Sequence, residues 1–98
     1  MRTKNKEVFM SSKELTKLRK EIDAVDSSIL KLINIRMCLA THTVKYKKQV
    51  KATGREKQIY ARLAKETKKL PYLNAKFTKE LLDLMMAHSK KLQYKALP

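Results

Sequence analysis

Two cationic side chains, Arg36 and Lys47, lie on one stripe of a long predicted helix, and Thr43 falls between them. At about 100° and 1.5 Å per residue, Lys47 is roughly 20° around the helix from Arg36 and about 16 Å along it. Such a face would suit a small ligand with more than one negative group, because arginine pairs with carboxylates in a bidentate manner. In the alternative interpretation, Arg36 extends into solvent or pairs with a carboxylate of a neighbouring helix, which avoids burying an unpaired charge.

Arg19 precedes Arg36 by 17 positions, which turns it by about 100° around the same helix. One ligand therefore cannot easily contact both arginines from a single straight helix. Across a two-fold dimer, however, Arg19 of one chain could reach a site centred on Arg36 of the other. Taken alone, Arg19 is expected to be a solvated residue near the helix start.

Further polar residues occur in pairs. Ser89 and Gln93 are four positions apart and therefore share a helix face, which is either part of a site or an exposed polar surface. Arg55 and Glu56 open a second predicted helix, where backbone N–H groups and the helix dipole favour anions. Glu56 also completes a T-x-x-E capping box with Thr53, which explains it without any ligand.

The remaining reactive side chains do not form a metal or nucleophile site. Cys38 is the only cysteine, so no disulfide can form within the chain. With His42 and His88 it makes too few ligands, at unsuitable spacing, for zinc or for a Cys/His nucleophile. We expect these three residues to serve packing or the surface, and we expect no metal or cofactor.

The long first helix must position most of the candidate cations. Residues 1–10 show no periodicity and are expected to form a flexible N-terminal arm. Ser11 and Glu14 then match an S-x-x-E capping box, and no Gly or Pro interrupts residues 12–50. Positions at 3-4 spacing over this range are typical of a helix packed along its length against another. The stripe consists of Leu15, Leu18, Ile22, Val25, Ile29, Leu32, Arg36, Leu39, Thr43 and Tyr46.

Two shorter helices follow, which makes the chain all-α with a single domain over residues 11–98. The second is expected from about Arg55 to Leu70, ended by Pro71, and the third is expected to be capped by Asn74. The residues predicted to face inward are Ile59, Leu63 and Ala64 on the second helix, and Phe77, Leu81, Leu84, Met85, His88 and Leu92 on the third.

The length of the first helix predicts an obligate homodimer. A helix over residues 12–50 would be roughly 55 Å long, whereas a compact chain of this size is only about 30 Å across. The helix is therefore expected to extend beyond its own subunit and pair with a second copy.

Charge and composition limit the classes of binding partner and the cellular compartment that we expect. The 98 residues carry 24 Lys and Arg against 9 Asp and Glu, a net charge of +15, which favours an anionic partner. A nucleic-acid-binding protein is one alternative, but aromatic residues are few, basic residues are spread along the chain, and no helix-turn-helix signature is present. We do not expect a nucleic-acid partner. A membrane span or signal peptide is not expected either, and the single thiol favours the cytoplasm.

Several of these residues occur together in one known pattern. Over residues 12–94 the chain resembles the all-helical AroQ-type chorismate mutases. The resemblance rests on LRKEIDAVD at 18–26, LINIR at 32–36, Lys47, Arg55-Glu56, Ser89 and Gln93. It implies an intertwined homodimer of three-helix subunits with shared active sites, which agrees with the dimer inferred from helix length. It also implies the one-step pericyclic rearrangement of the dianion chorismate to prephenate, in aromatic amino-acid biosynthesis, without nucleophile, metal or cofactor.

The resemblance further implies roles for the cations and the amide. Arg36 and Arg19 of the partner subunit would clamp the two carboxylates of chorismate. Lys47 and Gln93 would donate to the ether oxygen, where negative charge grows as the C–O bond breaks. Catalysis would then consist of holding the reactive conformer and stabilising that charge.

In the same pattern, Glu56 would accept from the substrate hydroxyl, and Arg55 and Ser89 would complete the polar lining. The chain departs from the pattern in a shorter connection before Arg55 and in the loss of an acidic residue often found there, since residues 52–54 are Ala-Thr-Gly. An isochorismate-pyruvate lyase of the same fold is the alternative enzyme, and the Arg55-Glu56 pair favours the mutase. A regulatory protein of this fold with little activity is a further possibility.

Overall fold

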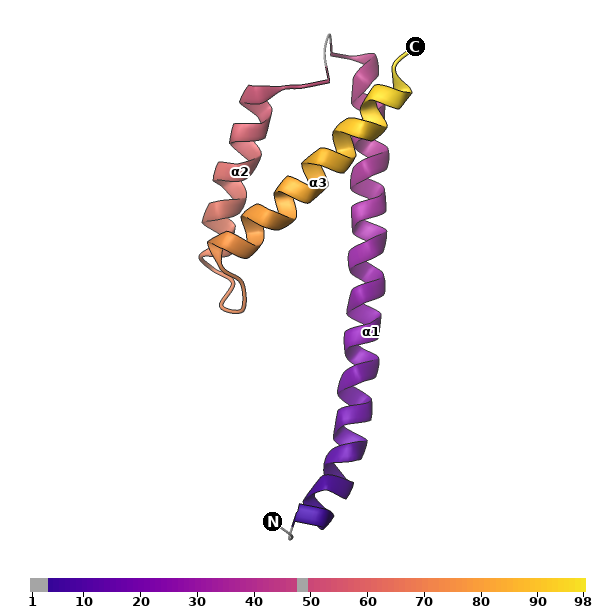
Figure 1. Ribbon diagram of the computed structural model, residues 1–98, viewed down its shortest axis with the longest axis vertical. Helices are drawn as coiled ribbons and strands as arrows, with labels where there is room; N and C mark the ends of the chain where they lie inside the picture. The colour runs from indigo at the N-terminus through magenta and orange to yellow at the C-terminus, as the bar shows by residue number, and fades with distance from the viewer. Residues whose placement is uncertain (1–3, 48–49) are drawn as a thin grey trace. The chain divides into compact units, whose positions relative to one another are not determined.

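The computed structural model describes the backbone of residues 4–47 and 50–98, and the side chains of this range from residue 12 onward. Helix α1 spans Lys4–His42, the 3-10 turn η1 spans Thr43–Lys45, α2 spans Thr53–Thr67, and α3 spans Ala75–Ala96 (Figure 1). No strand occurs in these ranges. The predicted all-α class, with three helices and a very long first one, is confirmed.

Helix α1 begins earlier than its capping box predicts. The helix starts at Lys4 and not at Ser11, so the S-x-x-E motif lies inside it. Because no Gly or Pro occurs before His42, nothing in the backbone stops the helix from extending toward the N-terminus. The expected helix start is therefore wrong, while the division into an arm over 1–10 and a domain over 11–98 stays a prediction.

The other end of α1 also differs from the expectation, because the helix ends at His42 and does not continue to residue 50. The hydroxyls of Thr41 and Thr43 donate to backbone carbonyls three residues earlier, at 2.7 and 2.6 Å. Side-chain hydroxyls that bond to the backbone compete with regular helix hydrogen bonds, and β-branched residues weaken the helix further. Lys47 consequently lies beyond the helix, and its predicted position on the Arg36 face is wrong.

The chain divides into two compact units, residues 1–36 and 37–98, which are described separately. In the first unit, the apolar stripe of α1 consists of exposed side chains. Its side chains from Leu15 to Leu32 are between 44% and 66% exposed. The core of the protein lies in the second unit.

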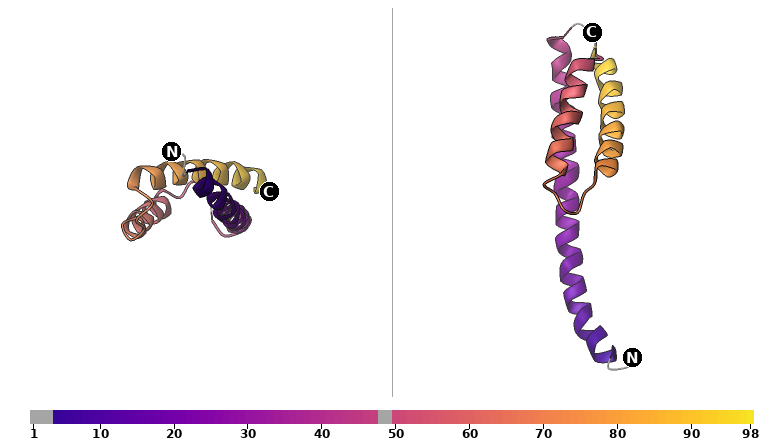
Figure 2. Two further views of the ribbon diagram at one scale, coloured as in Figure 1. Left: turned by 90° about the horizontal axis from the view of Figure 1, so that it is seen from below. Right: turned by 90° about the vertical axis from the view of Figure 1, so that its left-hand side faces the viewer.

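In the second unit, α2 and α3 run side by side in opposite directions (Figure 2). Ile59, Leu82 and Met86 form the buried cluster between them, and Tyr60 and Leu63 pack against it. Ile59 is buried and Leu63 partly buried, as predicted, whereas Ala64 is exposed and its predicted inward position is wrong.

The helix ends follow local hydrogen bonding. Asn74 caps α3 as predicted, because its side chain accepts from the backbone N–H of Phe77 at 2.8 Å. The capping box predicted for α2 does not form: Ala52 is the N-cap, and no side chain bonds there. Helix α2 also ends at Thr67, three residues before the predicted Leu70.

The face of α3 buried in this unit consists of Leu82, Met86, Ser89 and Gln93. It is not the predicted face, since Phe77, Leu81 and Leu84 are 51%, 40% and 70% exposed. Helix α3 has apolar residues on more than one side, and packing against α2 selects the side that carries two polar residues. This selection places Ser89 and Gln93 in the interior.

Candidate active site

Ser89 and Gln93 form a buried hydrogen-bonded pair on α3. They are only 3% and 6% exposed, which excludes the exposed polar surface considered from the sequence. Gln93 Nε2 donates to Ser89 Oγ at 2.8 Å. Gln93 Oε1 is buried and has no hydrogen-bond partner among the described residues. A buried polar atom without a partner costs free energy, so it marks a position where a further polar group is expected.

The Gln93 amide can also bind Ser89 in the reverse sense. If the amide turns by half a rotation, the Ser89 hydroxyl donates to Oε1, and the two N–H groups of Nε2 are left unpaired. Ser89 then holds one end of the amide, and the other end offers donors to a ligand oxygen. The pair therefore provides a positioned hydrogen-bonding group inside an otherwise apolar face.

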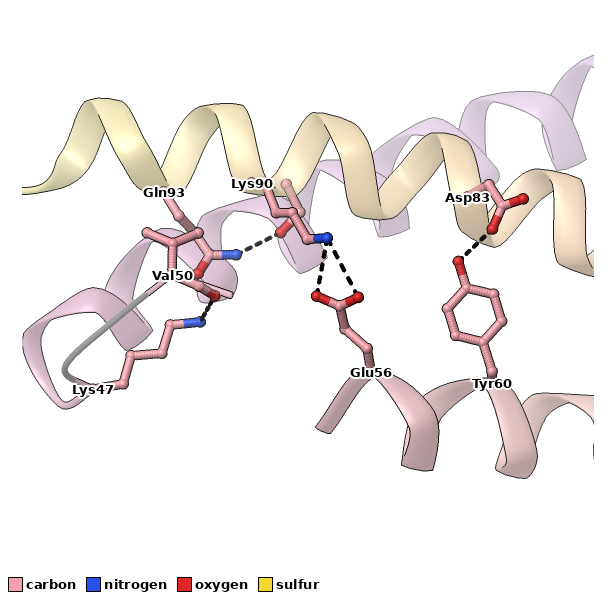
Figure 3. Close-up of polar contacts among 8 residues, drawn as sticks. Lys47, Val50, Glu56, Tyr60, Asp83, Lys90 and Gln93 are labelled. Atoms are coloured by element: carbon pink, nitrogen blue, oxygen red, sulfur yellow. Dashed lines mark hydrogen bonds and ion pairs between the residues drawn. The ribbon is translucent and has the colours of Figure 1, made fainter. Parts of the chain in front are cut away.

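Glu56 and Lys90 form the charged part of the site. Lys90 Nζ on α3 donates to Glu56 Oε1 on α2 at 3.3 Å and lies 3.1 Å from Oε2 (Figure 3). The side chains of Lys90 and Glu56 are only 32% and 23% exposed. Reasoning from the sequence missed Lys90, and no local signal indicates it, because its partner lies 34 positions away.

Lys47 lies in the same unit, after η1. Its Nζ donates to the backbone carbonyl of Val50 at 3.0 Å, and its side chain is half-buried (Figure 3). Arg55 is exposed in the first turn of α2. The second unit therefore supplies five of the seven predicted site residues, of which Glu56, Ser89 and Gln93 come from two helices that pack together.

The two remaining predicted residues, Arg19 and Arg36, belong to the first unit. Arg19 is exposed and Arg36 is half-buried. Their assembly with the residues of the second unit stays a prediction.

Tyr60 and Asp83 join α2 to α3 next to the charged pair. Tyr60 Oη donates to Asp83 Oδ1 at 2.5 Å (Figure 3). Lys79 Nζ donates to the other carboxylate oxygen at 2.9 Å. Burial and the Asp83 hydrogen bond raise the pKa of Tyr60 to about 12. The same hydrogen bond, together with Lys79, lowers the pKa of Asp83. Because Tyr60 follows Glu56 by one helical turn, this bond helps to fix α2 where Glu56 meets Lys90.

The described residues show neither a metal centre nor a membrane helix. They contain no group of three or more His, Cys, Asp or Glu side chains that could hold a metal ion. None of the helices in this part of the chain is long and apolar enough to cross a membrane. Cys38, His42 and His88 are all exposed and lie at the surface, so the prediction that His88 faces inward on the third helix is wrong.

The fold and the buried polar pair define an all-helical protein that offers positioned hydrogen-bonding groups. The chain matches the family model for chorismate mutase type II over residues 18–94. It therefore belongs to the chorismate mutase type II family, which confirms the resemblance seen in the sequence. Searches of curated proteins and of solved structures found no match.

Proposed function

We propose that this protein is a chorismate mutase, which rearranges chorismate to prephenate in aromatic amino-acid biosynthesis. The family match supports this reaction class. The observation that carries the proposal is the buried Ser89–Gln93 pair, whose amide has one unpaired end. The reaction breaks one ether C–O bond and forms one C–C bond within a single molecule, so it needs no proton transfer and no co-reactant.

The chemistry requires groups that bind, orient and stabilise charge. Gln93 would donate an N–H to the ether oxygen, with its amide oriented by Ser89. Lys47 would donate to the same oxygen after exchanging the Val50 carbonyl for substrate. A donor aimed at the charge that develops in the transition state contributes roughly 10²–10³ in rate, or about 2.7–4 kcal/mol. Binding a flexible substrate in its reactive conformer adds to this.

The remaining groups bind the two carboxylates and the hydroxyl of chorismate. Glu56 would accept from the hydroxyl, and Arg55 would add a cation at the start of α2. Arg36 and Arg19 of the partner subunit would each pair with one carboxylate, because the planar guanidinium binds carboxylate through two parallel hydrogen bonds.

The site is proposed to form in an intertwined homodimer. The uncovered stripe from Leu15 to Leu32 supports this assembly, because a row of half-exposed apolar side chains gains free energy when a second helix covers it. Helix α1 has 39 residues, which corresponds to about 58 Å. A second copy of the same helix supplies a matching apolar stripe of equal length. We further propose a cytoplasmic location, since Cys38 is an exposed single thiol.

One assay tests the function directly. The protein is incubated separately with chorismate and with isochorismate, and the products are identified. Prephenate from chorismate supports the proposal. Salicylate and pyruvate from isochorismate, without prephenate from chorismate, identify the lyase instead. The absence of turnover together with DNA affinity that falls steeply with salt would favour the nucleic-acid-binding alternative.

A further inference from the structure

Lys90 is a charged partner of the site that neither the sequence pattern nor the family match assigns. It lies on α3 directly after Ser89 and contacts both carboxylate oxygens of Glu56. It therefore connects the two helices at the carboxylate proposed to receive the substrate hydroxyl.

This ion pair differs from two ion pairs that form within single helices. Arg62–Glu66 and Lys79–Asp83 each join residues four apart on one helix, and their side chains are about half exposed or more. Exposed pairs of that kind contribute little. The Glu56–Lys90 pair crosses between helices and is 23% and 32% exposed, so solvent screens it less.

The charges explain why a lysine is useful at this position. Chorismate carries two carboxylates, and an ionised Glu56 in the same site would repel them. A carboxylate at this position nevertheless accepts the hydrogen bond of the substrate hydroxyl more strongly than a neutral group would, because charge-assisted hydrogen bonds are the stronger ones. Lys90 cancels the charge of Glu56 while leaving lone pairs on its oxygens available, because each carboxylate oxygen accepts more than one hydrogen bond.

We propose that Lys90 is a positioning residue of the mutase site, which holds the Glu56 carboxylate in place and offsets its charge against the dianionic substrate. This inference rests on the proposed function. Its effect falls on substrate affinity, because the charge compensation is needed as soon as the anion enters the site.

The test compares Lys90→Met with Lys91→Met, since Lys91 is the exposed neighbour on α3 and its loss changes net charge equally. Lys90→Met is expected to raise KM for chorismate about tenfold, with kcat within about threefold of wild type, because a hydrogen bond to a charged group contributes roughly one factor of ten. Lys91→Met is expected to change KM by less than about twofold. Lys90→Arg, which keeps the charge, should restore most of the affinity.

The same comparison in a Glu56→Gln background shows whether Lys90 acts through Glu56. Without the carboxylate there is no charge to offset, so adding Lys90→Met should then raise KM by less than about twofold. If Lys90→Met and Lys91→Met have the same KM, or if Lys90→Met acts equally in both backgrounds, the inference is overturned.

Two controls separate the possible failures. Wild-type protein that forms no prephenate refutes the proposed function, and this inference with it, before any variant is compared. Circular dichroism checks the helical fold of each variant. If Lys90→Met does not fold, Lys90→Gln carries the same comparison, because it also removes the charge and keeps a polar side chain.

Discussion

The Gln93 side chain is where stability and function are expected to oppose each other most clearly. In the free protein its Oε1 is buried without a partner among the described residues, and its Nε2 makes one hydrogen bond to Ser89. Gln93→Met keeps the length of the side chain and removes both polar ends. Losing the hydrogen bond costs about 1 kcal/mol, and removing the unpaired acceptor returns about 1–3 kcal/mol.

The variant is therefore expected to be more stable than wild type by about 1 kcal/mol. For a chain of this size, that difference raises Tm by roughly 4–8 °C. Ser89 loses an interaction partner, but its hydroxyl can donate to a backbone carbonyl one turn earlier, as Thr67 does to Leu63 at 2.7 Å. Activity should change in the opposite direction, with kcat reduced by roughly 10²–10³ because a donor to the ether oxygen is lost.

Thermal unfolding followed by circular dichroism measures the first effect, and initial rates of prephenate formation measure the second. Gln58→Met is the matched control, because it makes the same chemical change at an exposed position of α2 outside the site. A variant that loses stability while keeping normal kcat would refute the reasoning on both counts. The result would mean that Gln93 serves packing and not catalysis.

Three further experiments test particular residues. Asn74→Ala should lower stability by about 1 kcal/mol, and hence Tm by roughly 4–8 °C, because it removes the cap of α3. Thermal unfolding measures this difference, and an unchanged Tm would contradict the capping role. Tyr60→Phe should remove the component of the tyrosinate absorbance titration that has a pKa of about 12. The raised pKa of Tyr60 contributes stability only while the phenol is protonated. The difference in unfolding free energy between Tyr60→Phe and wild type should therefore shrink as pH rises from about 10 through about 12. The same variant removes a hydrogen bond that lowers the pKa of Asp83, so the part of the stability that is lost as pH falls below about 4 should also diminish. Mixing Arg19→Ala with Arg36→Ala protein should restore part of the prephenate activity, because a hybrid dimer contains one site with both arginines; no recovery in verified hybrids would argue against shared sites.

Local features of the sequence are sufficient for the number and approximate positions of the helices and for the family, although not for the exact helix ends. The lack of Gly and Pro from Lys4 to His42 permits one long helix, and Asn74 bonds its own backbone three residues on, so both depend on neighbours in the chain. The spacing of Arg19, Arg36 and Lys47 could be recognised as the family's pattern from the sequence alone. It reflects the order of residues along the chain and not their packing.

Other features were decided only by the tertiary structure. Periodicity alone favoured the wrong face of α3, because Phe77, Leu81 and Leu84 repeat as regularly as the residues that are buried. Contact with α2 selects the face of Leu82, and this choice places Ser89 and Gln93 inside. Helix propensity is a local quantity, whereas the choice of face depends on which side chains of the neighbouring helix fill the same space.

The Glu56–Lys90 pair shows most plainly the difference between what the sequence predicts and what packing decides. The sequence singles out Glu56 but gives no sign of Lys90 as its partner, because the two are 34 positions apart. They meet because the packing of Ile59 against Leu82 and Met86 sets the register of α2 on α3. The sequence by itself determined three helices and their family, and it supplied the prediction of the cations that would bind an anionic substrate. The tertiary structure decided which polar groups face one another, because that depends on the register of two helices and not on either one alone.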